Sequence, residues 1–345
     1  MYTKFFGLEK LPFNLTPDPG FLFLTSKHRE ALAGLTYAVL ERKGFVVLTG
    51  DAGTGKTTLL ARVLDRLPSH LIESSIILNP TLTPAEFLEL VMLDFDIPEV
   101  PASKAQRLWK LQRFLSRIHQ QGKIALLVID EAHKLSVELL EEIRLLGNFE
   151  YASDKFLQIV LLGQCELDDL LDRQDLRQFK QRIAVRLYID VLTSSEAEEY
   201  IKFRWTEAGA SEPLPFTPEA LQGIIQWSRG IPRLINSLCD SAILLAYVEG
   251  SHSVGMSYTR EAANHLGLLE IGVPRVAIPN GVSASVPADN HVGLKLVPVQ
   301  EPAQENVHPK LPEENHNLPN FAGYGSRKAN SSVFRWLAGK LGSSH

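Results

Sequence analysis

The sequence predicts an α/β protein in which a five-stranded parallel sheet lies between helices and is followed by a small all-helical domain. Three observations predict this fold. Apolar runs that would be buried on both faces alternate with helical patterns, as is typical of a parallel sheet covered by helices. A glycine-rich turn joins one of these runs to the next helix. From residue 194 to about residue 269 the pattern is helical throughout.

The apolar runs and the periodic segments give the order of the elements. The strands are expected at residues 45–49, 75–79, 124–129, 157–162 and 186–190. Helical periodicity predicts a helix from Ser26 to near Gly44, the helix after the glycine-rich turn, and two more at 84–93 and 104–121. Strand and helix therefore alternate as in a doubly wound sheet.

The helical region carries start signals of its own. Ser195 with Glu198 resembles a capping box, and Thr217 before Pro218 is typical of the first turn of a helix. These signals indicate a separate helical domain appended to the sheet.

Composition excludes several classes of protein. A chain of 345 residues with 45% hydrophobic and 22% charged residues is soluble and long enough for one large or two smaller cores. The net charge of −5 means that contact with nucleic acid would need a local basic patch. Cys165 and Cys239 lie far apart and fit a reduced compartment. Because no run of about 18 apolar residues and no signal peptide is found, we expect a cytoplasmic protein.

The glycine-rich turn matches the pattern G-x-x-x-x-G-K-[ST] between a strand and a helix, the context which that pattern requires. Its backbone N–H groups can turn inward around anionic oxygens, and the N-terminus of the next helix reinforces them. Lys56 would reach the outer phosphates and the Thr57 hydroxyl would bind Mg²⁺. The expected phosphate-binding residues are Gly50, Asp51, Ala52, Gly53, Thr54, Gly55, Lys56, Thr57 and Thr58. The sequence therefore predicts a nucleoside triphosphate site, with ATP and Mg²⁺ as cofactors.

Two acidic residues directly follow the apolar run 124–129. Asp130 is placed to hold Mg²⁺ together with Thr57, as in a Walker B motif, and Glu131 can orient and deprotonate a water molecule. A pair that only caps the next helix would not explain the apolar run before it. Hydrolysis of ATP is therefore expected.

The order of these motifs along the chain indicates which class of P-loop ATPase the sequence resembles. A further strand, 75–79, separates the phosphate loop from Asp130, which resembles the additional-strand glutamate class of P-loop ATPases. Asp130-Glu131-Ala132-His133 also occurs in a group of helicases, but the helical domain that follows the sheet argues against a helicase. His133 is either a helix-start residue or a sensor.

Two further residues are candidates for contact with phosphate. Gln164 follows Gly163 at the end of strand 157–162, where its amide can bind the γ-phosphate or the attacking water, or can serve a turn alone. Arg233 is expected in the first turn of a helix, where a cation opposes the helix dipole. That placement suggests a nearby anion.

Four arginines, Arg173, Arg177, Arg182 and Arg186, precede or begin the last strand. Charge on an exposed helix face explains most of them without a function. One of them could instead reach the nucleotide of a neighbouring subunit.

Together these motifs resemble one family. They are Phe5-Phe6-Gly7-Leu8 with Pro12-Phe13, Thr16-Pro17-Asp18-Pro19 with Phe21-Leu22, His28 with Glu30-Ala31-Leu32, Gly44-Phe45, the phosphate loop, Gly163-Gln164, Gln181-Arg182-Ile183 and Gly230-Ile231-Pro232-Arg233. Over about residues 1–268 the chain is similar to the ExeA/GspA family of AAA+ ATPases, which are related to general secretion pathway protein A.

The resemblance implies roles for several residues. Gln164 corresponds to sensor 1 and Arg233 to the sensor 2 arginine, and both are counted with Lys56 and Glu131 as catalytic. Arg182 is our first choice for the arginine finger and Arg177 the second, with Arg186 left open. The active form would then be a homo-oligomer, such as a hexameric ring.

The resemblance also implies a process. The family drives assembly of envelope or exopolysaccharide secretion machinery, so a protein of such a complex is the expected partner. No transmembrane or peptidoglycan-binding region follows the ATPase region in this sequence, which is similar to the shorter, soluble members. The alternative is a DNA-associated AAA+ regulator of the transposon target-selection type, which the acidic net charge disfavours. A nucleotide switch without hydrolysis is a third alternative, against which Glu131 argues.

The expected domains are an N-terminal arm packed on the core (1–24), the ATPase domain (25–192), a helical lid (193–269) and a disordered, proline-rich tail (270–345). The aromatic arm would either cover the nucleotide base or serve packing alone. Residues 333–341 could form a short amphipathic helix that docks on a partner or a membrane surface.

Overall fold

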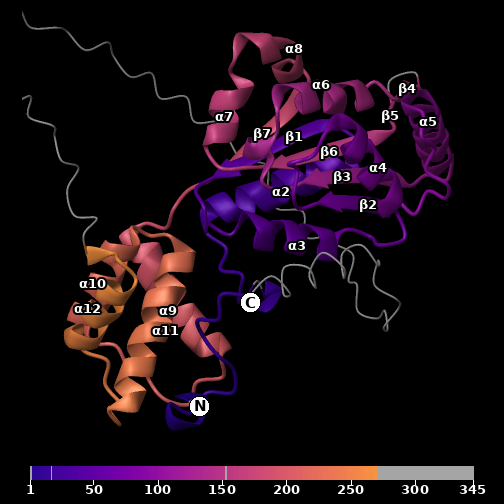
Figure 1. Cartoon of the computed structure of the whole chain (residues 1–345). Coiled ribbons are helices and arrows are strands. Elements are labelled where there is room, and N and C mark those ends of the chain that lie inside the picture. The colour runs from indigo at the N-terminus through magenta and orange to yellow at the C-terminus, as the bar shows by residue number, and fades with distance from the viewer. Residues whose placement is uncertain (1, 17, 152–153, 270–345) are drawn as a thin grey trace, which may run out of the picture. The chain divides into compact units, whose positions relative to one another are not determined.

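A parallel sheet forms the centre of the computed structural model, which describes residues 2–16, 18–151 and 154–269 (Figure 1). Its five strands, in the order β2-β3-β6-β1-β7, all run parallel to their neighbours. The strands are Phe45–Gly50 (β1), Ile72–Ile77 (β2), Ile124–Ile129 (β3), Leu157–Leu162 (β6) and Ile183–Ile189 (β7). The predicted five-stranded sheet is therefore confirmed. The expected tail and its terminal helix, 270–345, lie outside the described residues.

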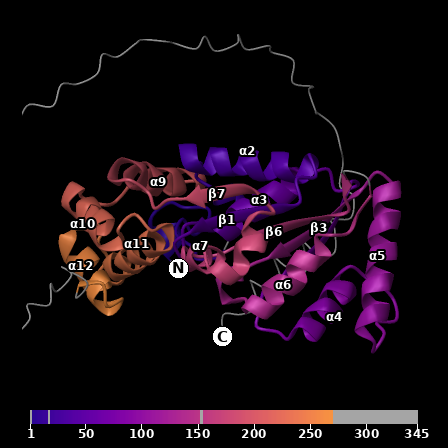
Figure 2. The same cartoon turned by 90° about the horizontal axis from the view of Figure 1, so that it is seen from above.

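Helices cover both faces of the sheet (Figure 2). One face is covered by α2 (Ser26–Leu40) and α3 (Lys56–Arg66). The other is covered by α4 (Pro84–Asp94), α5 (Lys104–Gln120), α6 (Val137–Leu146) and α7 (Glu166–Leu171). Alternate residues of β1 supply the two cores, because Val46 and Leu48 pack with α2 and α3 while Phe45 and Val47 pack on the opposite face.

Two strands begin earlier than predicted. β2 starts at Ile72 rather than at residue 75, and its register with β3 begins at the pair Ile72 and Ile124. The predicted strand begins at Ser75, and Ser74 before it is a polar residue that is nevertheless buried in the strand. β7, an edge strand, begins at Ile183 rather than at residue 186, and along it partly buried residues alternate with exposed ones up to the buried Ile189.

Four helices follow the sheet and share their own hydrophobic cluster. They are α9 (Ser194–Glu207), α10 (Pro218–Ser228), α11 (Pro232–Val248) and α12 (Met256–His265). Thr217 caps α10 as predicted. The capping box of α9 is formed by Thr193 and Glu196, so the prediction that placed it at Ser195 and Glu198 was wrong by two residues.

The N-terminal arm packs against these four helices. It contains α1 (Tyr2–Phe5) and η1 (Pro19–Phe21), and Phe6 and Phe13 are buried in the same cluster as Trp205. The core that most of the arm joins is therefore the helical one, whereas only its last residues, such as Leu24, pack against the sheet layer.

The remaining short elements are η2 (Ala132–Lys134), η3 (Gln174–Leu176), α8 (Arg177–Lys180) and the antiparallel pair β4 (Glu150–Tyr151) and β5 (Asp154–Lys155). None of these short elements was predicted from the sequence. In the described ranges, no helix combines the length and the apolar character needed to cross a membrane.

Candidate functional site

Three neighbouring strands bring the predicted residues to one edge of the sheet. β6 lies between β1 and β3, and its Leu161 pairs with Val47 on one side and Ile129 on the other. The phosphate loop, Asp130 and Gln164 each follow the carboxyl end of one of these strands. In open α/β sheets this is the edge at which ligands bind.

The glycine-rich loop fits closely between β7 and α11. Gly50 has φ +154°, and a Cβ there would lie 2.4 Å from the carbonyl oxygen of Ile189. Gly53 has φ +82°, and its Cβ would lie 2.8 Å from the Cβ of Arg233. Since no side chain tolerates such contacts, both positions require glycine.

Lys56, the first residue of α3, is almost fully buried at this loop. Its Nζ donates to the carbonyl oxygens of Gly50 at 2.6 Å and Asp51 at 2.7 Å. Burial lowers the pKa of Lys56, while the charges of Asp130 and Glu131 act in the opposite direction. The ammonium group is thus held between the loop backbone and the two carboxylates.

The two residues predicted to hold Mg²⁺ are hydrogen-bonded to each other. The Thr57 hydroxyl donates to Oδ2 of the buried Asp130 at 3.1 Å, and Oδ1 of Asp130 accepts the backbone N–H of Glu131 at 2.9 Å. A hydroxyl and a carboxylate fit Mg²⁺, which takes oxygen ligands and is usually bound by one or two protein groups together with phosphates and water. Among the described residues no cluster of three or more His, Cys, Asp or Glu side chains could hold a metal alone.

Glu131 adopts a left-handed backbone conformation with φ +56°. This region is uncommon for residues other than glycine and is enriched at functional sites. The Glu131 carboxylate lies 3.4 Å from Nζ of Lys134 and 3.6 Å from Nε2 of His133. Its direction is therefore set by two basic side chains of η2.

One cavity of about 580 Å³ collects most of the predicted residues. Those that line it are Ala52, Gly53, Thr54, Gly55, Lys56, Thr57, Thr58, Glu131, Gln164 and Arg233. Gly50 and Asp51 lie in the same loop behind Lys56, and Asp130 contacts Thr57. Residues of the arm and of α9 and α11 complete the lining.

Arg233 links α11 to the phosphate loop. It is the second residue of α11, and its backbone N–H donates to the carbonyl oxygen of Gly53 at 3.3 Å. Its side chain is exposed at the cavity and makes no ion pair within the described part of the chain. The N-terminus of α11 and the guanidinium therefore both present positive charge to the loop.

The predicted finger arginines do not line the cavity of their own chain. Arg182 donates to Oδ1 of Asn148, whereas Arg186 pairs with Asp168 at 3.3 Å and with Asp172 at 3.8 Å. Arg177 is exposed and forms no ion pair with any described residue. Burial lowers the pKa of Lys155, and the nearby charge of Arg182 lowers it further. The side chains of Lys155 and Arg182 are therefore two cations that lie close together.

Sequence reasoning gave no role at the site to the buried His28. Its Nε2–H donates to the carbonyl oxygen of Thr54 at 3.2 Å, and the Thr25 hydroxyl lies 2.8 Å from Nδ1. Burial lowers the pKa of His28 below its usual value. The ring therefore supports the phosphate loop from α2. Its signal in the sequence is its place beside Glu30-Ala31-Leu32 among the motifs that carry the family resemblance.

A second group that sequence reasoning missed connects the arm to α9 and α11. The Arg204 guanidinium is buried and donates to the carbonyl oxygens of Pro12 at 2.5 Å and Asn14 at 3.3 Å, and to the Tyr200 hydroxyl at 3.1 Å. Tyr200 donates in turn to Oδ1 of Asn236 at 2.9 Å. These contacts join segments distant in sequence, which no local pattern shows.

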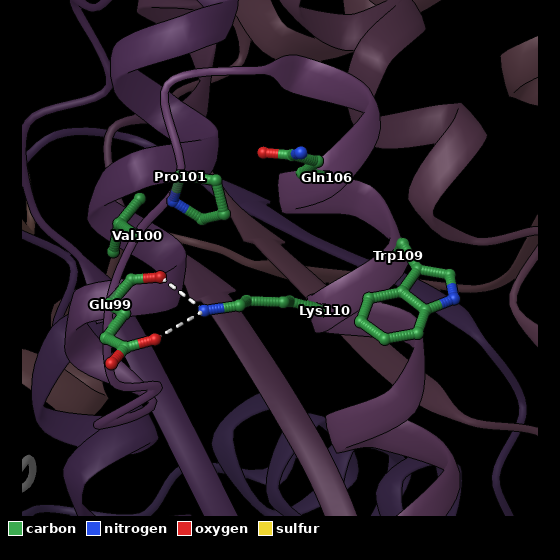
Figure 3. A pocket seen from close by; sticks show the side chains of 6 residues that line it. All are labelled: Glu99, Val100, Pro101, Gln106, Trp109 and Lys110. Carbon is green, nitrogen blue, oxygen red and sulfur yellow. Dashed lines mark hydrogen bonds and ion pairs between the residues drawn. The ribbon is translucent and has the colours of Figure 1, made fainter.

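A second hollow lies apart from these residues, between the loop at residues 99–101 and α5 (Figure 3). It measures about 410 Å³, and Lys110 bridges it by donating to the carbonyl oxygen of Glu99 at 2.7 Å. None of the predicted site residues lines it.

Comparison with known proteins supports this fold. The AAA domain family matches residues 39–171. General secretion pathway protein A of Aeromonas hydrophila is 41% identical over 256 residues, which are 74% of this chain and 46% of that protein, so the chain spans about half the length of this relative. The ORC2 protein of Aeropyrum pernix superposes with a TM-score of 0.56 at 17% identity, over 74% of this chain and 71% of that one. For Cdc6p of Pyrobaculum aerophilum the TM-score is 0.55 at 16% identity, over 74% of each chain. These two likenesses concern the fold alone.

Proposed function

Because the chain belongs to the AAA+ ATPases related to general secretion pathway protein A, we propose that it binds ATP with Mg²⁺ in the cavity at the sheet edge and hydrolyses it. One observation carries this proposal. The hydrogen bond from Thr57 to Asp130 joins the phosphate loop to β3 beside a cavity that Glu131 and Gln164 also line. A metal-binding pair, a general base and a polar sensor therefore lie in reach of one phosphate chain.

Each residue has a distinct task in this scheme. Lys56 would bind the outer phosphates in place of the loop carbonyls, and Thr57 and Asp130 would hold Mg²⁺, which would supply positive charge to the phosphates. Glu131 takes the proton of the attacking water. Arg233 binds phosphate oxygens from the helical domain, as a cation does at a developing negative charge.

The adenine ring of ATP would lie against the N-terminal arm. Phe21 and Phe23 line the same cavity as the loop, and Arg204 stacks on Phe21 at 4.7 Å while it holds the arm. Aromatic and aliphatic walls suit a purine ring. This supports the arm as a cover of the base in addition to its packing role.

We further propose a homo-oligomer, such as a hexameric ring, in which Arg182 completes the site of the next subunit. Arg182 is bound by a neutral amide rather than by a carboxylate, and Arg177 has no ion pair among the described residues. In contrast, carboxylates neutralise both Arg186 and Arg173. Arg182 and Arg177 are thus the arginines available for phosphate.

The proposed process is secretion or envelope export, served from the cytoplasm where ATP is available. The name and the 41% identity of the Aeromonas protein support this, although the shared region is 46% of that protein. The partner would be a protein of the export complex. Peripheral membrane contact through residues 333–341 remains a proposal from sequence alone.

ATPase assays with a set of variants test the function. The protein should release phosphate from ATP in the presence of Mg²⁺ and lose this activity with EDTA. Lys56→Ala should abolish ATP binding, whereas Glu131→Gln should bind ATP and lower the turnover number by about 10²-fold or more, because a general base typically contributes 10²–10⁴-fold. Arg260→Ala, on the exposed side of α12, is the control. Unchanged turnover in Glu131→Gln would contradict the assignment.

A DNA-associated role is the second candidate, and the outer face of α5 favours it. Trp109 is 55% exposed, the Arg113 guanidinium lies 4.7 Å from its ring, and Arg117 lies 5.4 Å from the ring of Phe114. Within the described residues neither arginine forms an ion pair. Such groups bind the backbone and bases of nucleic acid.

DNA-stimulated hydrolysis distinguishes this candidate. Stimulation that falls steeply with salt and is lost in Arg113→Ala/Arg117→Ala would support it. The absence of stimulation at low salt would exclude it and leave the export role.

A further inference from the structure

His133 connects the two residues to which hydrolysis is assigned. Its Nδ1 lies 3.3 Å from the backbone nitrogen of Gln164, and its Nε2 lies 3.3 Å from the side-chain amide nitrogen, Nε2, of Gln164. The same Nε2 is 3.6 Å from Oε2 of Glu131. The approach is close because residue 163 is glycine, whose added Cβ would lie 3.3 Å from the backbone nitrogen of His133. One imidazole ring thus contacts both the expected sensor and the expected base.

The hydrogen bonds fix the proton of this ring. The backbone N–H of Gln164 can only donate, so Nδ1 of His133 must accept and carries no proton. A neutral imidazole then carries its proton on Nε2, which must donate. The side chain of Gln164 can accept that proton only through Oε1, because its amide nitrogen has no acceptor capacity. The hydrogen-bond pattern therefore assigns the oxygen of the Gln164 amide to the position that faces His133, and the NH₂ group to the opposite side.

This direction matters because Gln164 lines the cavity of the phosphate loop. We infer that His133 is a positioning residue that turns the NH₂ group of Gln164 toward the terminal phosphate, so that Gln164 donates to phosphate oxygen and does not accept from the attacking water. The inference rests on the proposed hydrolysis and specifies how its sensor acts. The amide of a glutamine is otherwise free to exchange its two ends by a half-turn.

The same proton attracts the general base. Nε2 of His133 lies 3.6 Å from Oε2 of Glu131 as well as beside the amide of Gln164, and the same oxygen of Glu131 lies 3.4 Å from Nζ of Lys134. His133 therefore holds the sensor and the base on one side of the terminal phosphate. A ring lacking the Nε2 donor would release both side chains while leaving Lys56 and the loop untouched.

Two amide substitutions distinguish the contact made by Nδ1 of His133 from the contact made by Nε2. In His133→Asn, the side-chain oxygen takes the place of Nδ1 and keeps the bond from the Gln164 backbone, but the distal donor is lost. In His133→Gln, an amide group reaches the place of Nε2 and can donate there. His133→Asn therefore removes the distal donor while it preserves the local fold. His133→Gln restores the distal donor, which is the function that we assign to His133.

Steady-state hydrolysis of ATP with Mg²⁺ gives the expected result. His133→Asn should lower kcat about tenfold to a hundredfold, as is typical for loss of a group that orients a catalytic ligand, with KM within about twofold of the unmodified chain, because Lys56 and the loop still bind ATP. His133→Gln should recover most of kcat. An unchanged kcat in His133→Asn, or an effect on KM alone, would overturn the inference.

Substitutions at Gln164 test the direction of the amide. Gln164→Glu keeps an oxygen for His133 but has no NH₂ group, so it should lose as much kcat as Gln164→Ala. In the Gln164→Ala background, His133→Asn should cause a smaller loss than in the unmodified chain, because only its contact with Glu131 is left to lose. High activity of Gln164→Glu would show that Gln164 accepts from water and would refute the inference.

A spectroscopic readout separates this inference from the proposed function. ¹⁵N spectra of the whole chain, with the His133 signal identified by its absence in His133→Asn, should show an unprotonated Nδ1 and a protonated Nε2. The opposite tautomer would overturn the inference whether or not the chain hydrolyses ATP. If the unmodified chain shows this tautomer but no hydrolysis, the proposed function fails and the placement of the proton stands.

Discussion

Arg204 provides the sharpest test of how the N-terminal arm is held, and we expect Arg204→Met to loosen it. Methionine keeps much of the length and apolar character of the buried stem but removes the guanidinium. The carbonyl oxygens of Pro12 and Asn14 then lose the hydrogen bonds that Arg204 donates to them. The Tyr200 hydroxyl loses the third hydrogen bond of Arg204. The ring of Phe21 also loses the cation 4.7 Å from its centre.

The magnitude follows from these contacts. Each hydrogen bond from a charged donor contributes about 1.5–3 kcal/mol. Removing a buried cation recovers several kcal/mol of its desolvation cost, so we expect a net loss of about 3 kcal/mol in the free energy of unfolding. For a folded region of this size, that corresponds to a fall of about 6–12 °C in Tm.

Thermal denaturation followed by circular dichroism measures this change in Tm. Titration with ATP measures the affinity of the cavity for nucleotide. Arg204→Met should also weaken ATP binding, because Asn14 and Phe21 line the same cavity as the phosphate loop. Arg260→Met, at an exposed position of α12, should change Tm by less than about 2 °C. If the Tm of Arg204→Met stays within about 2 °C of the unmodified chain, the arm is not held by Arg204 and the reasoning fails.

Three further predictions use other contacts. Gly53→Ala should weaken ATP binding at least about tenfold, measured by titration, because its Cβ would lie 2.8 Å from the Cβ of Arg233. Burial lowers the pKa of His28, so the folded state resists its protonation and stability should fall as pH drops below about 6.5; His28→Asn should reduce the difference in Tm between pH 7.5 and pH 5.5, and an equal difference would contradict this. Arg182→Ala should bind ATP normally but not hydrolyse it, and mixing it with Glu131→Gln should restore part of the turnover if the finger acts between subunits; no recovery would argue against it.

The sequence predicts the sheet well where the signal is local. β1, β3 and β6 are buried along their whole length and therefore appear as unbroken apolar runs. The phosphate loop and the Asp130-Glu131 pair follow directly from such runs, so sequence reasoning could place them at one edge. The predicted start of β2 is three residues late because the polar residues Glu73 and Ser74 precede Ser75, although Ser74 is buried in the strand.

The parts that sequence reasoning missed depend on distant contacts. Arg204 meets the arm across 192 positions of sequence, and Tyr200 meets Asn236 across 36. The sequence predicts either a helix-start residue or a sensor at His133, whereas the contacts of its ring are with Gln164, 31 positions away. Tertiary packing decides such contacts, and periodicity carries no information about them.

The bond between Arg204 and Pro12 also has a consequence for biosynthesis. Pro12 is synthesised 192 positions before Arg204 of α9, so this part of the arm must wait for α9 before it finds the donor that holds it. The wall that the arm contributes to the cavity can therefore close only after the sheet and α9 have been made. A truncated chain that ends before α9 would keep the phosphate loop but lack this wall, so tight binding of nucleotide would mark chains whose synthesis has passed α9.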